Sequence, residues 1–157
     1  MKTTKAKTRI RMMIDRDIPA LVRLDSAACP QMPLTEKHFR DCIRLYNSWT
    51  PLVIEHGGEL RSFCIMQHDR SDLVLFRLIA NPVGVWHDCF AIYLDWLKAH
   101  GNWQRILVDL PERDVETQIV FRRMGLYCTR IERGAYDDDP SDIQAAYVFE
   151  YRRSTEG

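Results

Sequence analysis

The chain has 157 residues, of which 46% are hydrophobic and 28% charged, a balance that fits one globular domain over residues 1–157. Its 22 basic and 22 acidic side chains cancel, which argues against nucleic acid or an anionic membrane as a partner. No apolar run reaches the roughly 18 residues of a membrane span, and no signal-peptide core follows residues 1–7, which we expect to form a flexible tail. The five cysteines show no C-x-x-C spacing, which predicts reduced thiols and a cytoplasmic protein.

The N-terminal half predicts a strand, two helices and a β-hairpin. Polar and apolar residues alternate over residues 8–13, as they do in a strand. Asp17 begins the first helix, which ends before Pro30, and Thr35 caps the second. In that second helix we expect one shared face for Phe39, Ile43 and Tyr46. The hairpin strands are residues 50–55 and 59–67, joined by Gly57-Gly58.

The C-terminal half predicts strands that alternate with helices. Residues 73–80 are almost continuously apolar, which suits a strand buried on both faces. A helix follows at 86–100, with Gly101 as its stop. The remaining elements are a strand at 104–109, a helix at 115–124 ended by Gly125, and strands at 127–133 and 145–152. The order is β-α-α-β-β-β-α-β-α-β-β, a mixed α/β domain with helices on both faces of its sheet.

Two of these segments resemble the GNAT superfamily of N-acetyltransferases, and within it the ribosomal-protein-alanine (RimI-type) enzymes. Where the family reads L-E-V-R-x-x-N and then L-Y-x-x-x-G-F, this chain reads V-D-L-P-E-R-D at 108–114 and V-F-R-R-M-G-L at 120–126. Residues 33–39 resemble the family's P-W-S/T-x-x-x-F helix entry, and further matches lie at 133–136 and 146–148. The resemblance implies a GNAT fold, a mostly antiparallel sheet splayed between its fourth and fifth strands.

The resemblance also implies a reaction. The pantetheine arm of acetyl-CoA would lie between the splayed strands, on the backbone of Leu78 and Ile79, with Asp114 and Phe121 flanking the coenzyme. The acceptor would be a primary amine, either a protein N-terminus or a small molecule, and a homodimer is left open. Attack on the thioester needs an oxyanion donor, a base and an acid for the leaving thiolate. The family's glutamate base corresponds to Asp109, and its tyrosine acid corresponds to Phe121, which has no proton to give.

The family's pyrophosphate loop, Q/R-x-x-G-x-G/A, aligns here with G-V-W-H-D-C. Glycines in such a loop let backbone N–H groups approach the phosphates. His87 and Cys89 replace the two small residues, and Asp88 adds a negative charge. Either a loop of another shape still binds the coenzyme, with His87 at a phosphate, or the site has decayed. The loop residues expected at the coenzyme are Gly84, Val85, Trp86, His87, Asp88 and Cys89.

Several of these side chains also have a plain structural interpretation. Trp86 either stacks on a ring of the ligand or fills a vacated coenzyme groove. Cys89 is either a reactive thiol at a helix start or a buried structural one. His87 and Cys89 cannot converge on one ion from neighbouring helical positions, so no metal site is predicted. The acidic run at 137–142 is either a solvated loop or a selector of cationic substrates.

The sequence therefore predicts an N-acetyltransferase that uses acetyl-CoA. The alternative, from another class, is a catalytically degenerate GNAT-fold protein with a binding or regulatory role. Phe121 and His87 favour this alternative, whereas Asp109 and the order of strands and helices favour the enzyme.

Overall fold

The computed structural model describes residues 7–133 and 145–154. Within this part of the chain the predicted order of elements is confirmed, and the boundaries differ from the predicted ones by at most two residues. The helices are α1 (Ile18–Ala28), α2 (Glu36–Arg44), α3 (Trp86–Lys98) and α4 (Val115–Arg123), with short 3-10 turns η1 (Asp15–Asp17) and η2 (Val83–Val85). The strands are β1 (Thr8–Met12), β2 (Trp49–His56), β3 (Glu59–Asp69), β4 (Asp72–Ala80), β5 (Arg105–Pro111), β6 (Tyr127–Glu132) and β7 (Ala146–Arg152).

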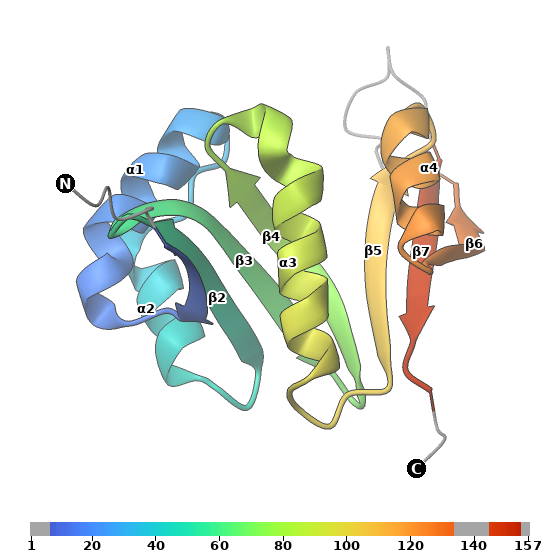
Figure 1. Ribbon diagram of the computed structural model, residues 1–157, viewed down its shortest axis with the longest axis horizontal. Helices are drawn as coiled ribbons and strands as arrows, with labels where there is room; N and C mark the ends of the chain where they lie inside the picture. Colours follow the sequence, from blue (N-terminus) through green and yellow to red (C-terminus); the bar gives the residue numbers. More distant parts are fainter. Residues whose placement is uncertain (1–6, 134–144, 155–157) are drawn as a thin grey trace, which may run out of the picture. The chain divides into compact units, whose positions relative to one another are not determined.

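The strands form one seven-stranded sheet in the order β1-β2-β3-β4-β5-β7-β6 (Figure 1). The pairs β1–β2, β2–β3, β5–β7 and β6–β7 are antiparallel. Strands β4 and β5 are parallel, and α3 lies in the crossover connection that a parallel pair needs. The predicted mixed α/β class, with a mostly antiparallel sheet, is confirmed.

The described chain divides into two compact units. The first holds residues 7–68 and 76–100, and the second holds residues 69–75, 101–133 and 145–154. The boundary crosses β4, whose first residues belong to the second unit. A single domain over residues 1–157 stays a prediction.

In the first unit, helices α1 and α2 cover one face of the sheet and α3 covers the other (Figure 1). Successive side chains of a strand point to opposite faces, so a strand covered on both sides is apolar throughout. Phe63 of β3 packs edge-to-face against Phe39 of α2, with ring centroids 5.4 Å apart. Its neighbour Ser62 points the other way, where its Oγ accepts a 2.9 Å hydrogen bond from the Tyr93 hydroxyl of α3. In β4 this double cover holds for residues 78–80, which are buried. Phe76, in the middle of the strand, is 47% exposed, so the predicted burial on both faces does not extend along the whole of β4.

A buried ion pair joins α1 to β4. The Asp25 side chain is fully buried, and its Oδ1 accepts from Arg77 Nη1 at 2.7 Å. Its Oδ2 accepts from the Leu34 N–H at 2.6 Å. Arg77 also donates to the Met32 carbonyl at 3.1 Å. The pair thus fixes the segment between α1 and α2, which its prolines keep out of a helix.

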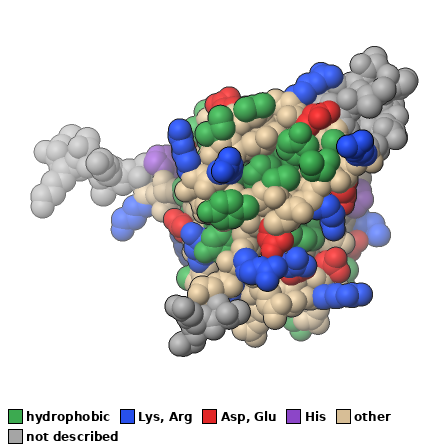
Figure 2. Space-filling model, turned by 90° about the vertical axis from the view of Figure 1, so that its right-hand side faces the viewer, with side chains coloured by type: hydrophobic (Ala, Val, Ile, Leu, Met, Phe, Trp, Pro, Cys, Tyr) green, Lys and Arg blue, Asp and Glu red, His purple; other side chains and the backbone are tan. Residues whose placement is uncertain are grey.

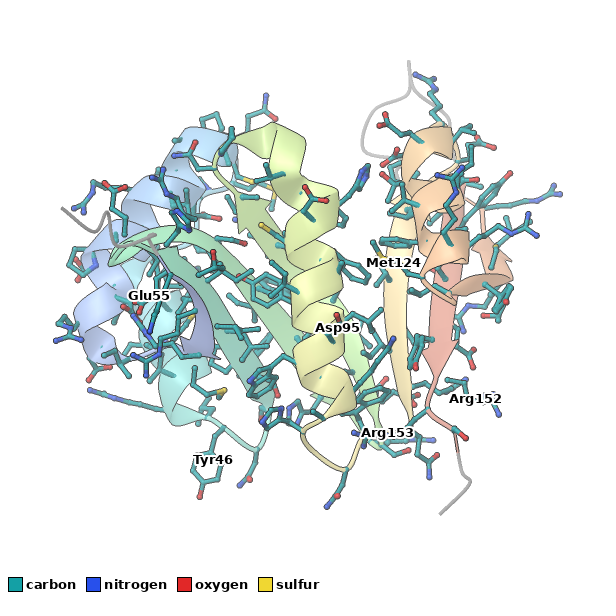
Figure 3. The ribbon with its side chains drawn as sticks, in the orientation of Figure 1. Tyr46, Glu55, Asp95, Met124, Arg152 and Arg153 are labelled. Carbon is teal, nitrogen blue, oxygen red and sulfur yellow. The ribbon has the colours of Figure 1, made fainter. Side chains whose placement is uncertain are left out.

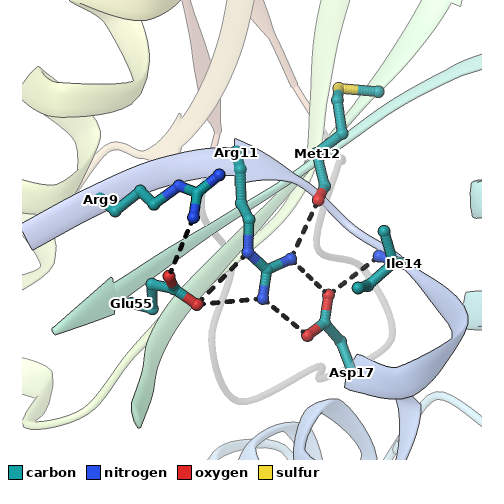
Figure 4. A network of polar contacts seen from close by, with 6 residues as sticks. All are labelled: Arg9, Arg11, Met12, Ile14, Asp17 and Glu55. Atoms are coloured by element: carbon teal, nitrogen blue, oxygen red, sulfur yellow. Dashed lines mark hydrogen bonds and ion pairs between the residues drawn. The ribbon is translucent and has the colours of Figure 1, made fainter. Parts of the chain in front are cut away.

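A second network of charges holds β1 against β2 and the start of α1 (Figure 4). Arg11 binds Asp17 through both guanidinium ends, at 2.8 and 2.9 Å, and reaches Glu55 of β2 at 3.1 Å. Asp17 is buried and accepts from the Ile14 N–H as well. Burial by itself raises the pKa of Asp17, but the hydrogen bonds from Arg11 and Ile14 and the charge of Arg11 outweigh it, so the pKa lies below the ordinary 3.8.

Replacing Arg11 with Met is expected to lower the free energy of unfolding at neutral pH by about 1.5–3 kcal/mol, because a charged hydrogen-bond network is lost and Asp17 stays buried. A carboxyl whose pKa is depressed by folding stabilises the protein above its unfolded pKa, and this stabilisation disappears as the pH falls through the folded pKa. Urea unfolding of both proteins should therefore show a difference that shrinks as the pH falls below about 4. An undiminished difference in acid would contradict this account of Asp17.

In the second unit, α4 packs on one face of β5, β7 and β6. Phe121 of α4 meets Phe149 of β7, with ring centroids 5.8 Å apart, and both side chains are buried. Gly125 takes a φ of 92°, a conformation that strains other residues, and ends α4 as predicted. Figure 2 shows this side of the molecule, where hydrophobic side chains lie among charged ones. The exposed hydrophobic residues of α4 and β6 are Val115, Ile119, Tyr127 and Ile131.

One prediction about the inner face of α2 is wrong. Phe39 is buried as expected, but Tyr46 is 70% exposed and points away from the sheet (Figure 3). The helix ends at Arg44, and Leu45 leaves helical geometry while its N–H still bonds to the Asp41 carbonyl. Helical spacing therefore stops before it can carry Tyr46 to the buried face.

Candidate functional site

The backbone of β4 divides its polar groups between two edges. The Asn81 N–H, just past the strand, donates to the Arg61 carbonyl of β3 at 2.9 Å, and the Ile79 carbonyl accepts from Ser62 Oγ, also of β3, at 2.7 Å. Peptide groups alternate in direction along a strand, so those of Leu78 and Ala80 point to the opposite edge. On that edge, within the part of the chain that the structure describes, the ladder joins residues 72–74 of β4 to residues 105–107 of β5, and Leu78 and Ala80 lie beyond it.

Trp86 already occupies one of these edge groups. Its indole Nε1 donates a 3.0 Å hydrogen bond to the Leu78 carbonyl. The ring also stacks on Phe90, one helical turn along α3, with centroids 5.7 Å apart and planes 4° from parallel. Of the two sequence-based interpretations of Trp86, the contact favours the one in which the side chain fills space beside β4.

The segment between β4 and α3 has its own geometry. Turn η2 leads to Val85 at the cap position, and α3 begins at Trp86, so Asp88 lies in the first turn. A side chain built on Gly84 would meet no atom within 4 Å, which leaves the space beside that residue open. The His87 ring is half-buried and lies edge-on to Trp86, with centroids 5.7 Å apart. Coenzyme binding by Gly84, Val85, Trp86, His87 and Asp88 stays a prediction.

Cys89 has the surroundings of a structural thiol. The side chain is buried, and burial raises its pKa, with a smaller opposing contribution from a hydrogen bond with Ser62. A thiol whose pKa is raised is mostly protonated at neutral pH and is a poor nucleophile. Its neighbour Tyr93 is buried against the same Ser62, and burial raises the pKa of that phenol strongly. These groups form a polar contact inside the core rather than a reactive site.

A cleft of about 500 Å³ adjoins the end of β4 within the first unit. Helix α1 forms one wall, and β3 and β4 form the other. Of the predicted coenzyme residues, only Ile79 lines this cleft. Its charged lining residues are Arg23, Glu59 and Arg61.

Asp109 lies in the middle of β5, in the second unit, opposite Val148 of β7. Its side chain is exposed, on the face of the strands that points away from α4. Although the side chain is exposed, the surrounding protein partly desolvates its carboxylate and so raises the pKa of Asp109. The negative charge of Glu132 raises this pKa further, and Arg130 lowers it. A carboxylate that binds a proton more tightly than usual suits a general base.

Asp114 and Phe121 have clear structural roles in α4. The Asp114 carboxylate caps the helix by accepting from the Thr117 N–H at 3.2 Å. Phe121 is fully buried against Phe149 and brings no hydroxyl to the position of the family's tyrosine. Contact of either residue with the coenzyme stays a prediction.

Sequence reasoning missed the partner of Arg130. Arg130 Nη2 lies 2.8 Å from Glu132 Oε1, and these two residues supply the charges that act on Asp109. Their positions two apart on one strand are a signal for a shared face, but only the register of β6 against β7 brings that face next to Asp109. The predicted acidic run at 137–142 lies outside the described residues.

The described residues hold no group of three or more His, Cys, Asp or Glu side chains that would suit a metal ion. No helix in this part of the chain combines the length and apolarity needed to cross a membrane. All five cysteines are free thiols.

No family model matches the chain, and no curated protein matches it in sequence. Solved structures do match it. The ribosomal-protein-S18-alanine N-acetyltransferase of Escherichia coli aligns with a TM-score of 0.76 and 17% identity, over 96% of this chain and 97% of that one. A GNAT-family acetyltransferase of Streptococcus pneumoniae gives 0.74 and 16%, over 94% and 100%. The yncA protein of Salmonella typhimurium, solved with its cofactor acetyl-CoA, gives 0.74 and 10%, over 96% of each chain.

The chain has the GNAT fold. The resemblance predicted from residues 108–114 and 120–126 is thereby confirmed for the architecture, including the likeness to a ribosomal-protein-alanine acetyltransferase. At these identities the GNAT fold is what the solved structures share with this chain. Its activity has to be argued from its own residues.

Proposed function

We propose that this protein transfers an acetyl group from acetyl-CoA to a primary amine. The observation that carries the proposal is the edge of β4 beyond Val74, where the peptide groups of Leu78 and Ala80 lie past the ladder to β5. A strand edge outside its ladder can bind an extended amide-bearing chain by main-chain hydrogen bonds, and here the chain would replace the indole at the Leu78 carbonyl. Pantetheine is such a chain, and the N–H of Leu78 or Ala80 on the same edge can stabilise the oxyanion of the tetrahedral intermediate.

Asp109 is the proposed base. It takes a proton from the acceptor ammonium, directly or through one water, and the neutral amine then attacks the thioester carbonyl. The raised pKa of Asp109 brings it closer to the pKa of the acceptor ammonium, so proton transfer between them costs less. The difference between the two pKa values is smaller for an α-ammonium, with a pKa of about 7.7–8.0, than for a lysine side chain, with a pKa of about 10.4. This favours a protein N-terminus or another α-amine as the acceptor.

The leaving group departs as a thiolate. Phe121 offers no proton, but a free thiol has a pKa of about 8.5, so its thiolate is a tolerable leaving group in water. Collapse of the tetrahedral intermediate breaks the carbon–sulfur bond, and solvent protonates the sulfur. The absence of the acid costs rate without blocking the reaction.

The direct test is acetyl transfer to peptides with a free N-terminus and to matching peptides with a blocked N-terminus and a free lysine. Mass spectrometry should find the mass gain of one acetyl group on the first set, at a rate proportional to protein concentration. Transfer to neither set, at any coenzyme concentration, would sink the proposal. The free cysteines fit an enzyme of the cytoplasm, where acetyl-CoA is available.

Replacing Trp86 with Phe is expected to tighten acetyl-CoA binding by about 2- to 10-fold, because the coenzyme no longer displaces an indole hydrogen bond from the Leu78 carbonyl. The substitution keeps an aromatic ring against Phe90. Calorimetric titration measures the change, and Trp96→Phe on the same helix is the matched control. Weaker binding by Trp86→Phe would mean that the indole contacts the coenzyme instead.

The alternative is a GNAT-fold binding protein without catalysis. Two observations favour it, the buried Phe121 in place of an acid and the indole on the Leu78 carbonyl. Such a protein would leave acetyl-CoA intact. In such a protein, Asp109→Asn would leave ligand binding unchanged and would alter only the charge of this surface.

A further inference from the structure

The register of three strands lines up charged residues on one face of the second unit. Asp109 of β5 pairs with Val148 of β7, and Val148 pairs in turn with Arg130 of β6. Directly paired residues point to the same face of a sheet, so all three side chains share the face that points away from α4. Two strand spacings separate Asp109 from Arg130, about 10 Å between backbones, a span that an arginine side chain largely covers.

The Glu132 side chain lies on the same face as Asp109 and Arg130. It lies two residues after Arg130 on β6, hence on the same face, and pairs with Ala146 of β7. Its Oε1 lies 2.8 Å from Arg130 Nη2. Val148 and Ala146, which separate this pair from β5, are both buried and carry no charge of their own. Arg130 and Glu132 are the charged residues that act on Asp109. Glu150 of β7 lies on the same face, two residues after Val148, and is held by Arg105 and Arg152 at 3.4 and 3.0 Å.

We propose that Glu132 is a positioning residue for the reaction, which acts on Asp109 while Arg130 holds Glu132 in place. The proposal rests on the proposed function, in which Asp109 removes a proton from the acceptor ammonium. In that step the N–H bond breaks, the proton passes to an Asp109 oxygen, and the electron pair stays on the amine nitrogen. A second carboxylate nearby opposes the ionised form of Asp109 and so favours proton uptake.

The net charge of Asp109, Glu132 and Arg130 together also supports this role. Asp109, Glu132 and Arg130 sum to one negative charge, which an acceptor with a single ammonium group neutralises. If Arg130 were not held by Glu132, it would be free to turn to Asp109 and stabilise the carboxylate. The ion pair between Arg130 and Glu132 therefore keeps the base from being neutralised by its own arginine.

Carboxyl-carbon NMR titration tests whether Glu132 and Arg130 act on the pKa of Asp109, and it needs no coenzyme. The Asp109 signal is assigned by its loss in Asp109→Asn. Glu132→Gln should lower the pKa of Asp109 by at least about half a unit, and Arg130→Gln should raise it by a similar amount. An Asp109 pKa that does not move in either variant overturns the inference, whatever the wild-type protein catalyses.

The pH dependence of kcat/KM tests whether the effect of Glu132 on Asp109 matters for catalysis. Activity falls as the pH drops through the pKa of the base, so Glu132→Gln should move this acid limb to lower pH, and Arg130→Gln to higher pH. Glu59→Gln is the matched control, because Glu59 and Arg61 form a similar pair on β3, 2.9 Å apart and exposed. An acid limb that moves no more than in this control overturns the catalytic use of Glu132. Lack of transfer by the wild type overturns the proposed function itself, and the NMR titration separates the two failures.

Discussion

Asp109→Asn is expected to lower kcat/KM for acetyl transfer by about 10²–10⁴-fold, the usual contribution of a general base. Asparagine has nearly the shape of aspartate but cannot take a proton from the ammonium. The dissociation constant of acetyl-CoA should stay close to the wild-type value, because the proposed coenzyme contacts are backbone groups of β4. Steady-state kinetics and calorimetry on the same preparation separate the two effects.

The control for this experiment is Asp95→Asn. Asp95 lies on the exposed side of α3 (Figure 3), where its carboxylate is 3.9 Å from the Lys98 amine, a pair too exposed to matter for rate or fold. A general base must act in the chemical step, so an unchanged kcat/KM in Asp109→Asn would remove Asp109 from the mechanism. Equal losses in the two variants would point to an effect of charge in general.

Arg77→Met is expected to lower the free energy of unfolding by about 3–5 kcal/mol, because it leaves the Asp25 carboxylate buried without its cation. The Leu34 N–H still donates to Asp25, but one hydrogen bond does not compensate for a lost ion pair. Urea unfolding followed by circular dichroism measures the loss. Protein that fails to fold at all would be the extreme of the same result.

The matched control is Arg61→Met, which removes the arginine of an exposed pair on β3. That change should cost between zero and about 1 kcal/mol. Two equal losses would mean that arginine stems, rather than the buried charge of Asp25, provide the stability. A loss below about 1 kcal/mol in Arg77→Met would contradict the account of this ion pair.

The fold could be predicted because local signals in this chain agree with one another. The apolar end of β4, residues 78–80, is buried as its sequence predicts, and Gly125 stands where α4 needs a positive φ. The failure at Tyr46 shows the limit of periodicity, since spacing alone does not tell where a helix ends. A tertiary contact, such as that between Asp25 and Arg77, leaves no trace in a local pattern.

The candidate site could be predicted only in part. A carboxylate at the position of Asp109 follows from the sequence, but its raised pKa comes from partial desolvation and, to a smaller extent, from Glu132 on another strand. The contact of Trp86 with the Leu78 carbonyl also depends on how α3 begins, which the residues between Ala80 and Trp86 leave open. Phe121 was recognisable as a departure from the family pattern, and the structure adds that its ring is buried.

The central claim is that the edge of β4 at Leu78 and Ala80 accepts the pantetheine arm of acetyl-CoA. Calorimetric titration of the wild-type protein with acetyl-CoA tests this claim most directly. We expect saturable binding at one site with a micromolar dissociation constant. The absence of binding heat up to millimolar coenzyme, at more than one temperature, would contradict it.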